Sequence, residues 1–206
     1  MMPPEETMIP TRRRLLTTGL ALTLAAPALI RPRAARADQP VPPLGEDGLH
    51  KPDWIVETFR DMRDDLEEAN SEGKRMLVLV EQRGCIYCTR MHEHIFIDDE
   101  IARMLREDYF VVQMNLFGDI PVTDFDGVEE GERDMMVRWN VVFTPTMLFM
   151  PETVPESGTA AQNAVMVMPG AFERGTTRLM LRWVLEKGYE SDEHFQHYVA
   201  RNLGSN

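Results

Sequence analysis

Two cysteines, Cys85 and Cys88, are the only ones in the chain, and two residues separate them. A short apolar run precedes the pair and a helical pattern follows it, so both thiols are predicted at a strand-to-helix junction. The partial positive charge of a helix N-terminus stabilises a thiolate on the first sulfur, and Arg83 adds to that charge. This arrangement suits thiol–disulfide exchange, with Cys85 as the attacking nucleophile and Cys88 as the resolving thiol.

Other chemistries of the same residues fit less well. A zinc site needs four ligands, and the two cysteines with His92 or His94 supply only part of one. A c-type haem site is excluded because Thr89, not histidine, follows Cys88. A static disulfide across so short a step contributes little loop-closure stabilisation. Redox cycling without a metal or an organic cofactor is therefore the favoured interpretation.

His92 and Glu81 are the titratable residues predicted to assist the thiols. His92 follows Cys88 by four residues and shares its helix face. We expect it either to tune the thiol or to be an ordinary, partly buried helix histidine. Glu81 ends the apolar strand, where period two places it on the same face as Leu79. It is predicted either to accept the proton of Cys88 or to be a solvated acid at the strand end.

Hydrophobic patterns predict the elements that position these residues. Residues 76–80 form a continuous apolar run, which indicates a central buried strand. A helix is predicted from residue 53 to a stop at Gly73, because apolar residues recur there at intervals of three and four. Further helices are predicted over 98–107, 132–139, 176–187 and 192–202, and strands over 109–116, 143–150 and 164–168. The order predicts an α/β sandwich around a small mixed sheet.

The order of the motifs resembles that of thioredoxin-fold proteins, over residues 53–189. The strand leads into the Cys-x-x-Cys, and residues 138–149 (RWNVVFTPTMLF) resemble the family's aromatic-Gly/Asn-Val-x-x-x-Pro-Thr-hydrophobic segment. Residues 170–179 resemble its closing Gly-x-x-x-x-Gly-x-x-x-Leu. The resemblance implies a central mixed β-sheet flanked by helices. It also implies a cis Thr144–Pro145 bond against the two sulfurs, with Thr144, Pro145 and an exposed Tyr87 forming the substrate groove.

A longer stretch around the cysteines points to a subgroup. Residues 81–92 (EQRGCIYCTRMH) resemble the E-x-x-G-C-x-Y-C-x-x-M-H stretch of periplasmic SoxW-type proteins, which are linked to sulfur oxidation. That resemblance implies that electrons arrive from a membrane thiol carrier and pass to disulfides of periplasmic proteins. The chain departs from ordinary thioredoxins at Leu79, where they carry a buried acid.

The N-terminal residues are predicted to be an export signal. Residues 1–37 contain six arginines and two acidic residues, a net charge of +4. Because the whole chain has a net charge of −12, the remaining residues have a net charge of −16. Residues 11–16 (TRRRLL) resemble a twin-arginine signal, although an ordinary Sec signal is the alternative, and residues 35–37 offer a cleavage site. The apolar run is too short for a permanent anchor. We therefore expect a periplasmic protein with a Pro-rich, extended leader at 38–52 and a C-terminal extension at 190–206.

Composition excludes one class of binding partner and leaves two alternative functions open. The acidic excess argues against nucleic acid as the partner. Residues 117–131 are predicted to form an acidic surface insertion. The fifteen methionines suit an adaptable core. Together with Cys85, Cys88 and His92, they leave copper binding or delivery as an alternative. A disulfide oxidase or isomerase is a further alternative, because motifs do not give the direction of electron flow.

Overall fold

The computed structural model describes residues 41–203, and a four-stranded sheet in the order β2-β1-β5-β6 lies at their centre. Strand β1 (Arg75–Glu81) pairs in parallel with β2 (Tyr109–Asn115) and antiparallel with β5 (Thr146–Phe149). Strand β6 (Met166–Pro169) pairs antiparallel with β5 at the edge. All seven residues of β1 are buried, as expected of a continuous apolar run in a central strand.

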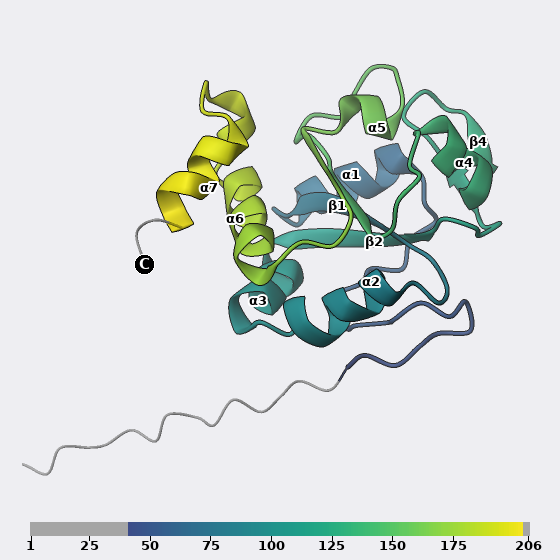
Figure 1. Cartoon of the computed structure of the whole chain (residues 1–206). Helices are drawn as coiled ribbons and strands as arrows, with labels where there is room; N and C mark the ends of the chain where they lie inside the picture. The colour runs from purple at the N-terminus through teal and green to yellow at the C-terminus, as the bar shows by residue number, and fades with distance from the viewer. Residues whose placement is uncertain (1–40, 204–206) are drawn as a thin grey trace, which may run out of the picture. The chain divides into compact units, whose positions relative to one another are not determined.

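Helices cover both faces of this sheet (Figure 1). Helices α1 (Met62–Ser71), α4 (Glu132–Arg138) and α5 (Ala160–Asn163) pack on one face. Helix α2 (Ile86–Arg90), the π-helical turn η1 (Met91–Ile95), α3 (Asp99–Glu107) and α6 (Arg174–Leu185) lie on the other. Helix α7 (Phe195–Leu203) follows the short turn η2 (Gly188–Glu190) and packs against α6. Within residues 41–203 no helix is long and apolar enough to cross a membrane.

Side chains of β1 divide between two hydrophobic cores. Leu77 and Leu79 join the core under α3 and α6, while Met76, Val78 and Val80 join the core under α1 and α4. This alternation follows from the period of two along a strand. Most of the methionines from Met62 onward are buried in these cores, as their interpretation as adaptable core residues predicted. The observed architecture is the predicted mixed sheet flanked by helices.

The helix predicted from residue 53 is wrong in its first nine residues, because α1 begins at Met62. Residues 55 and 56 instead lie beside β2, where the Val56 N–H donates to the Val111 carbonyl oxygen at 2.9 Å. The Asp61 side chain then caps α1 by accepting from the N–H groups of its first turn. Phe59, counted in the apolar pattern, is fully exposed. Tertiary pairing therefore overrides a chance match to helical spacing in 53–61.

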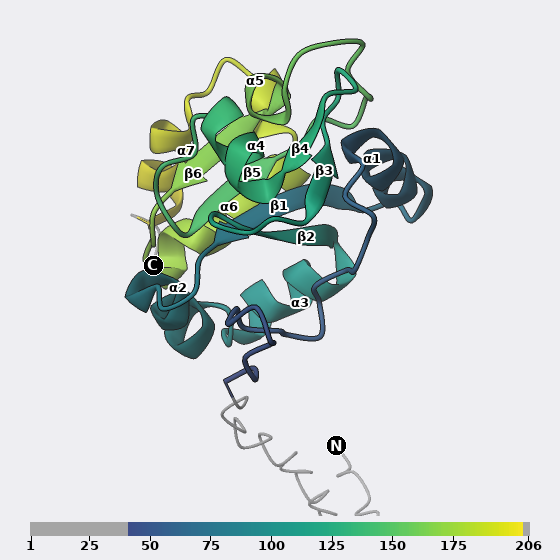
Figure 2. The same ribbon diagram turned by 90° about the vertical axis from the view of Figure 1, so that its right-hand side faces the viewer.

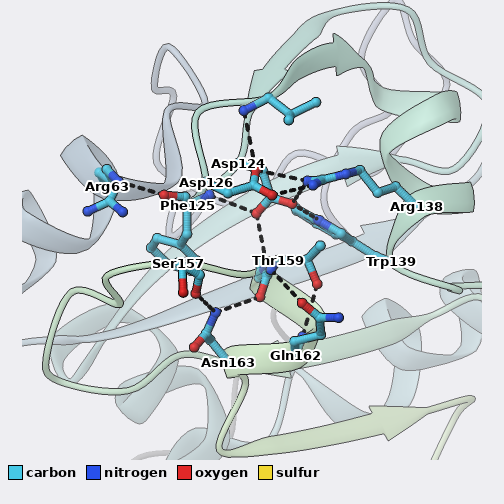
Figure 3. Close-up of polar contacts among 12 residues, drawn as sticks. Arg63, Asp124, Phe125, Asp126, Arg138, Trp139, Ser157, Thr159, Gln162 and Asn163 are labelled. Carbon is cyan, nitrogen blue, oxygen red and sulfur yellow. Dashed lines mark hydrogen bonds and ion pairs between the residues drawn. The ribbon is translucent and has the colours of Figure 1, made fainter.

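The acidic insertion predicted over 117–131 is a hairpin with a buried base. It contains β3 (Pro121–Thr123) and β4 (Glu129–Gly131), and Val122 and Phe125 are fully buried. Asp124 is fully buried as well, so not all of its acids form a solvated rim. The Arg63 Nε donates to the Phe125 carbonyl oxygen at 2.6 Å and joins α1 to the hairpin (Figure 3).

The buried Asp124 carboxylate ties the hairpin to two helices. It accepts hydrogen bonds from Arg138 Nη1 at 2.5 Å, from Trp139 Nε1 at 2.7 Å and from the Ala160 N–H at 2.8 Å. Figure 3 shows the Arg138 and Trp139 side chains converging on it. A buried charge is tolerated only where it is paired and hydrogen-bonded, and Asp124 has both kinds of partner.

Residues 41–54, called here the roof segment, pack on the sheet domain. The sequence predicted an extended leader over 38–52, of which 38–40 lie outside the described residues. From residue 41 the chain instead makes a turn closed by a bridge between Leu44 and His50, with Leu49 buried. In Figure 2 the segment runs beneath α2 and α3 as the darkest part of the ribbon. The predicted signal at 1–37 also lies outside the described residues.

Asp65 in α1 makes the stability of the fold depend on pH. Burial raises the pKa of Asp65 to about 7, and the charges of Asp61 and Glu68 add to the rise, against a hydrogen bond from Thr58. The unfolded chain releases this proton near its ordinary pKa, about 3.9. The folded chain binds this proton more tightly than the unfolded chain does. Its contribution to the free energy of unfolding is therefore fully present below pH 4 and is lost as the pH rises to 7.

We expect Asp65→Asn to remove that dependence. Its free energy of unfolding should exceed that of the wild type by about 1 to 2 kcal/mol at pH 8, with little difference near pH 4. Urea denaturation at the two pH values measures this. The exposed Glu67→Gln, on the same helix, is the matched control. An Asp65→Asn protein that loses stability with pH as the wild type does would contradict the assignment.

Candidate active site

The two cysteines form a disulfide at the start of α2. Gly84, with a φ of 72°, turns the chain out of the strand region, and Cys85 is the N-cap residue of the helix. The Cys88 N–H donates to Cys85 Sγ at 3.0 Å. The Cα atoms are 5.2 Å apart, within the usual range for a disulfide. The structure thus places both sulfurs at the predicted strand-to-helix junction.

The Thr144–Pro145 peptide bond is cis, as the resemblance implied, and it lies against the first sulfur. Thr144 Oγ1 donates to Cys85 Sγ at 3.4 Å, and the Thr144 carbonyl oxygen is 3.6 Å from the same sulfur. The Gly170 N–H donates to the Pro145 carbonyl oxygen at 2.7 Å. This hydrogen bond holds the loop before β5 to the segment that joins β6 to α6. Strand β6 and the loop before β5 therefore position the threonine together.

Exposed apolar side chains lie next to the sulfurs in sequence at the start of α2 and next to the cis bond in the loop before β5. Ile86 and Tyr87 lie between the cysteines, and Tyr87 is 57% exposed, in agreement with its predicted exposure. Val142 and Phe143 precede the cis bond, and Phe143 is 64% exposed. We call these four residues the apolar rim. Exposed apolar residues gathered at one place commonly mark a contact surface.

Glu81 is buried at the end of β1, only 1% exposed, so its interpretation as a solvated acid is wrong. Its carboxylate accepts hydrogen bonds from Gln113 Nε2 at 2.6 Å and from His92 Nε2 at 3.0 and 3.2 Å. His92 is itself fully buried in η1. The wider π-helical turn, closed by the Phe96 N–H on the Met91 carbonyl oxygen, presents this histidine to the strand.

A small cavity connects the acid with the sulfurs. It has a volume of about 180 Å³, and Glu81, Cys85 and Cys88 line it on the domain side. The roof segment lines the opposite side with Leu44, Gly48, Leu49 and His50. We call it the front cavity. Its walls allow water to stand between the acid and the thiols, which is the arrangement a proton transfer needs.

Arg83 has a different set of contacts from the one predicted. Its guanidinium donates to the carbonyl oxygens of Glu46 at 2.7 Å and Asp47 at 3.2 Å, both in the roof segment. Gly48, with a φ of 76°, passes so close to this side chain that an added Cβ would lie 2.7 Å from Arg83 Nε. The described contacts of Arg83 therefore hold the roof segment, and a tuning effect on Cys85 stays a prediction.

The sequence interpretation missed three residues of this site, Gln113, His50 and Trp54. Gln113 is the one buried polar residue in an otherwise apolar strand, and a buried amide needs partners. That signal was available. The rings of His50 and Trp54 lie 4.7 and 6.1 Å from the His92 ring, and only the tertiary structure brings them there.

A copper site does not assemble from the proposed residues. Among the described residues, no group of three or more histidine, cysteine or acidic side chains is placed to hold a metal ion. His92 Nε2 is occupied by Glu81 and does not join Cys85 and Cys88 in one ligand set.

Comparison with known proteins agrees with this geometry. Residues 62–156 match the model of the thioredoxin-like domain. Together with the sheet order and the cis bond, the match shows that the described residues adopt the thioredoxin fold. Over 74% of this chain and 94% of its own, a thioredoxin-fold protein from Helicobacter pylori superimposes with a TM-score of 0.54 at 14% identity. A thioredoxin from Thermus thermophilus gives 0.47 at 21% identity, over 62% of this chain and 86% of that one.

No curated protein sequence matches the chain significantly. The likeness of the thioredoxin-like domain to solved structures concerns the fold, because the identities are low. The thioredoxin fold predicted from the motifs is confirmed, with its mixed central sheet flanked by helices.

Proposed function

We propose that the protein is a thiol–disulfide oxidoreductase that reduces disulfides of other proteins. The observation that carries the proposal is the Cys85–Cys88 disulfide at the start of α2, in contact with the cis Thr144–Pro145 loop. A helix N-terminus favours the thiolate of Cys85, and the apolar rim with Tyr87 offers a surface for the substrate chain around it.

The reaction follows from the placement of the two sulfurs. The Cys85 thiolate attacks one sulfur of the substrate disulfide, forms a mixed disulfide and releases the other substrate sulfur as a thiolate. Cys88 gives its proton to Glu81 and attacks Cys85 Sγ, which releases the second substrate thiolate. The substrate gains two electrons, which the Cys85–Cys88 pair loses. The Glu81 proton and one from solvent neutralise the released thiolates.

The finer assignment rests on the sequence. The resemblance of residues 81–92 to SoxW-type proteins supports a role with periplasmic disulfides, including those of sulfur oxidation, and a membrane thiol carrier as electron donor. The signal-like residues 1–37 support twin-arginine export to the periplasm. Electron flow in the opposite direction would make the same site an oxidase or isomerase, and reduction potential decides between these.

Two measurements test the proposal. The reduced protein is expected to accelerate insulin reduction by dithiothreitol, and Cys85→Ser to abolish that effect. The reduction potential of the pair is expected near that of thioredoxin, about −270 mV, and a value near about −120 mV would overturn the reductant direction. Tight copper binding without insulin reduction would instead support the copper alternative.

A further inference from the structure

The roof segment reaches the acid of the active site through a single glutamine. Lys51 Nζ donates to Gln113 Oε1 at 2.7 Å, and Gln113 Nε2 donates to the His50 carbonyl oxygen at 2.9 Å. Both contacts fix which end of the amide is oxygen and which is nitrogen. The amide nitrogen is therefore left to donate its other hydrogen to Glu81 Oε2, at 2.6 Å.

His92 supplies the second donor to the same carboxylate. Its Nδ1 is buried and has no hydrogen-bond partner among the described residues. A buried N–H without an acceptor is costly, so the ring proton belongs on Nε2, which faces Glu81. The ring is held in place by Phe96, edge-on at 5.1 Å, and by Trp54, stacked at 6.1 Å.

Two donors on one buried carboxylate fix where its oxygens lie. The front cavity joins this carboxylate, the proton acceptor of the proposed reaction, to Cys88. The other titratable and charged groups that face this pocket or hold its walls come from the roof segment, the loop after β1, α2 and η1. They are Asp47, His50, Lys51, Arg83, Cys85 and His92.

We propose that Lys51 is a positioning residue of the active site, which acts through Gln113 to hold the Glu81 carboxylate where it accepts the Cys88 proton. This inference rests on the proposed function. Lys51 lies outside residues 62–156, the span matched by the thioredoxin-like domain, so the roof segment adds a part that the matched domain lacks. His92 supports the same carboxylate from the other side.

Proton transfer matters in only one of the two chemical steps. The attack of Cys85 on the substrate disulfide needs no proton from Cys88. The resolving step moves the Cys88 proton to Glu81 while the Cys88–Cys85 bond forms and the bond from Cys85 to the substrate breaks. Loss of the Lys51 contact should therefore slow the resolving step and spare the first.

Stopped-flow reaction of the reduced protein with 5,5′-dithiobis(2-nitrobenzoate) separates the two steps, because each releases one coloured thiolate. We expect Lys51→Met to slow the second release about tenfold at neutral pH and leave the first within about twofold. Its pH profile for the second release should also shift, since that profile reports the proton acceptor of the resolving step, which Lys51 holds through Gln113. Lys51→Arg should restore most of the rate.

Asp47→Asn is the matched control for a merely structural role. It removes the ion pair of Lys51 with Asp47, at 2.7 Å in the roof segment, but keeps the contact of Lys51 with Gln113. Asp47→Asn should leave the pH profile of the second release in place. An unshifted profile in Lys51→Met, or an equal shift in Asp47→Asn, would overturn the inference. A wild type that releases no second thiolate would instead refute the proposed function itself.

Discussion

Serine in place of Cys88 is expected to turn the protein into a trap that keeps its substrate as a mixed disulfide on Cys85. The first sulfur would still attack, because its helix N-cap position and its contact with Thr144 do not depend on the Cys88 thiol. Resolution would fail, since no other cysteine exists in the chain. We expect disulfide reduction to fall about a thousandfold or more.

Non-reducing electrophoresis and mass spectrometry of the trapped species measure this outcome. Cys85→Ser is the matched control, and it should lose activity without holding a substrate, because Cys88 is the more deeply buried sulfur. The trap also captures partner proteins as mixed disulfides, which allows them to be identified. Turnover by Cys88→Ser at the wild-type rate would contradict the resolving role of Cys88 and assign that role to an external thiol such as dithiothreitol.

Replacing Asp124 with alanine is expected to cost about 3 to 5 kcal/mol of folding free energy. The carboxylate is fully buried, and its removal leaves Trp139 Nε1 and the Ala160 N–H without an acceptor and Arg138 without its buried partner. A buried donor without an acceptor destabilises the fold by its full desolvation free energy. Thermal and urea denaturation of the variant measure the loss.

Asp126→Ala is the matched control, because Asp126 pairs with the same Arg138 at the surface. Its loss should be much smaller, since water screens an exposed ion pair. Equal losses in the two variants would show that Arg138, rather than the burial of Asp124, determines the effect. Helix α4 ends at Arg138, a few residues before Thr144. In the Asp124 variant, the loop that contains Thr144 should therefore also be less firmly held, at temperatures below the melting temperature of the protein.

Local patterns predicted the elements whose burial is uniform. The apolar run within β1 and the strong apolar face of α3, capped by Asp98, could be placed from the sequence alone. The segment 53–61 could not, because its apolar residues serve β2 and the surface rather than a helix face. Asp124 was misinterpreted for a similar reason. Acidic composition does not reveal that an arginine and a tryptophan from the next helix will surround one of the acids.

The candidate site divides in the same way. Cys85 and Cys88 follow from motif spacing, and Pro145 from the resemblance of residues 138–149 to thioredoxin-fold proteins. The burial and hydrogen bonding of Glu81 could not be predicted in this way, because they depend on donors from β2 and η1 that only the folded chain brings together. Period two predicted the correct face of the strand but not what would cover it.

The roof segment has a consequence for where the working unit of this protein begins. A chain trimmed to residues 62–156, the span of the domain match, would lose Lys51, the wall of the front cavity and strand β6. Such a fragment would still present Cys85 and Cys88 in sequence, but with Glu81 open to water on one side. The unit that we propose for the complete exchange is therefore longer than residues 62–156, and recombinant versions should start no later than residue 41.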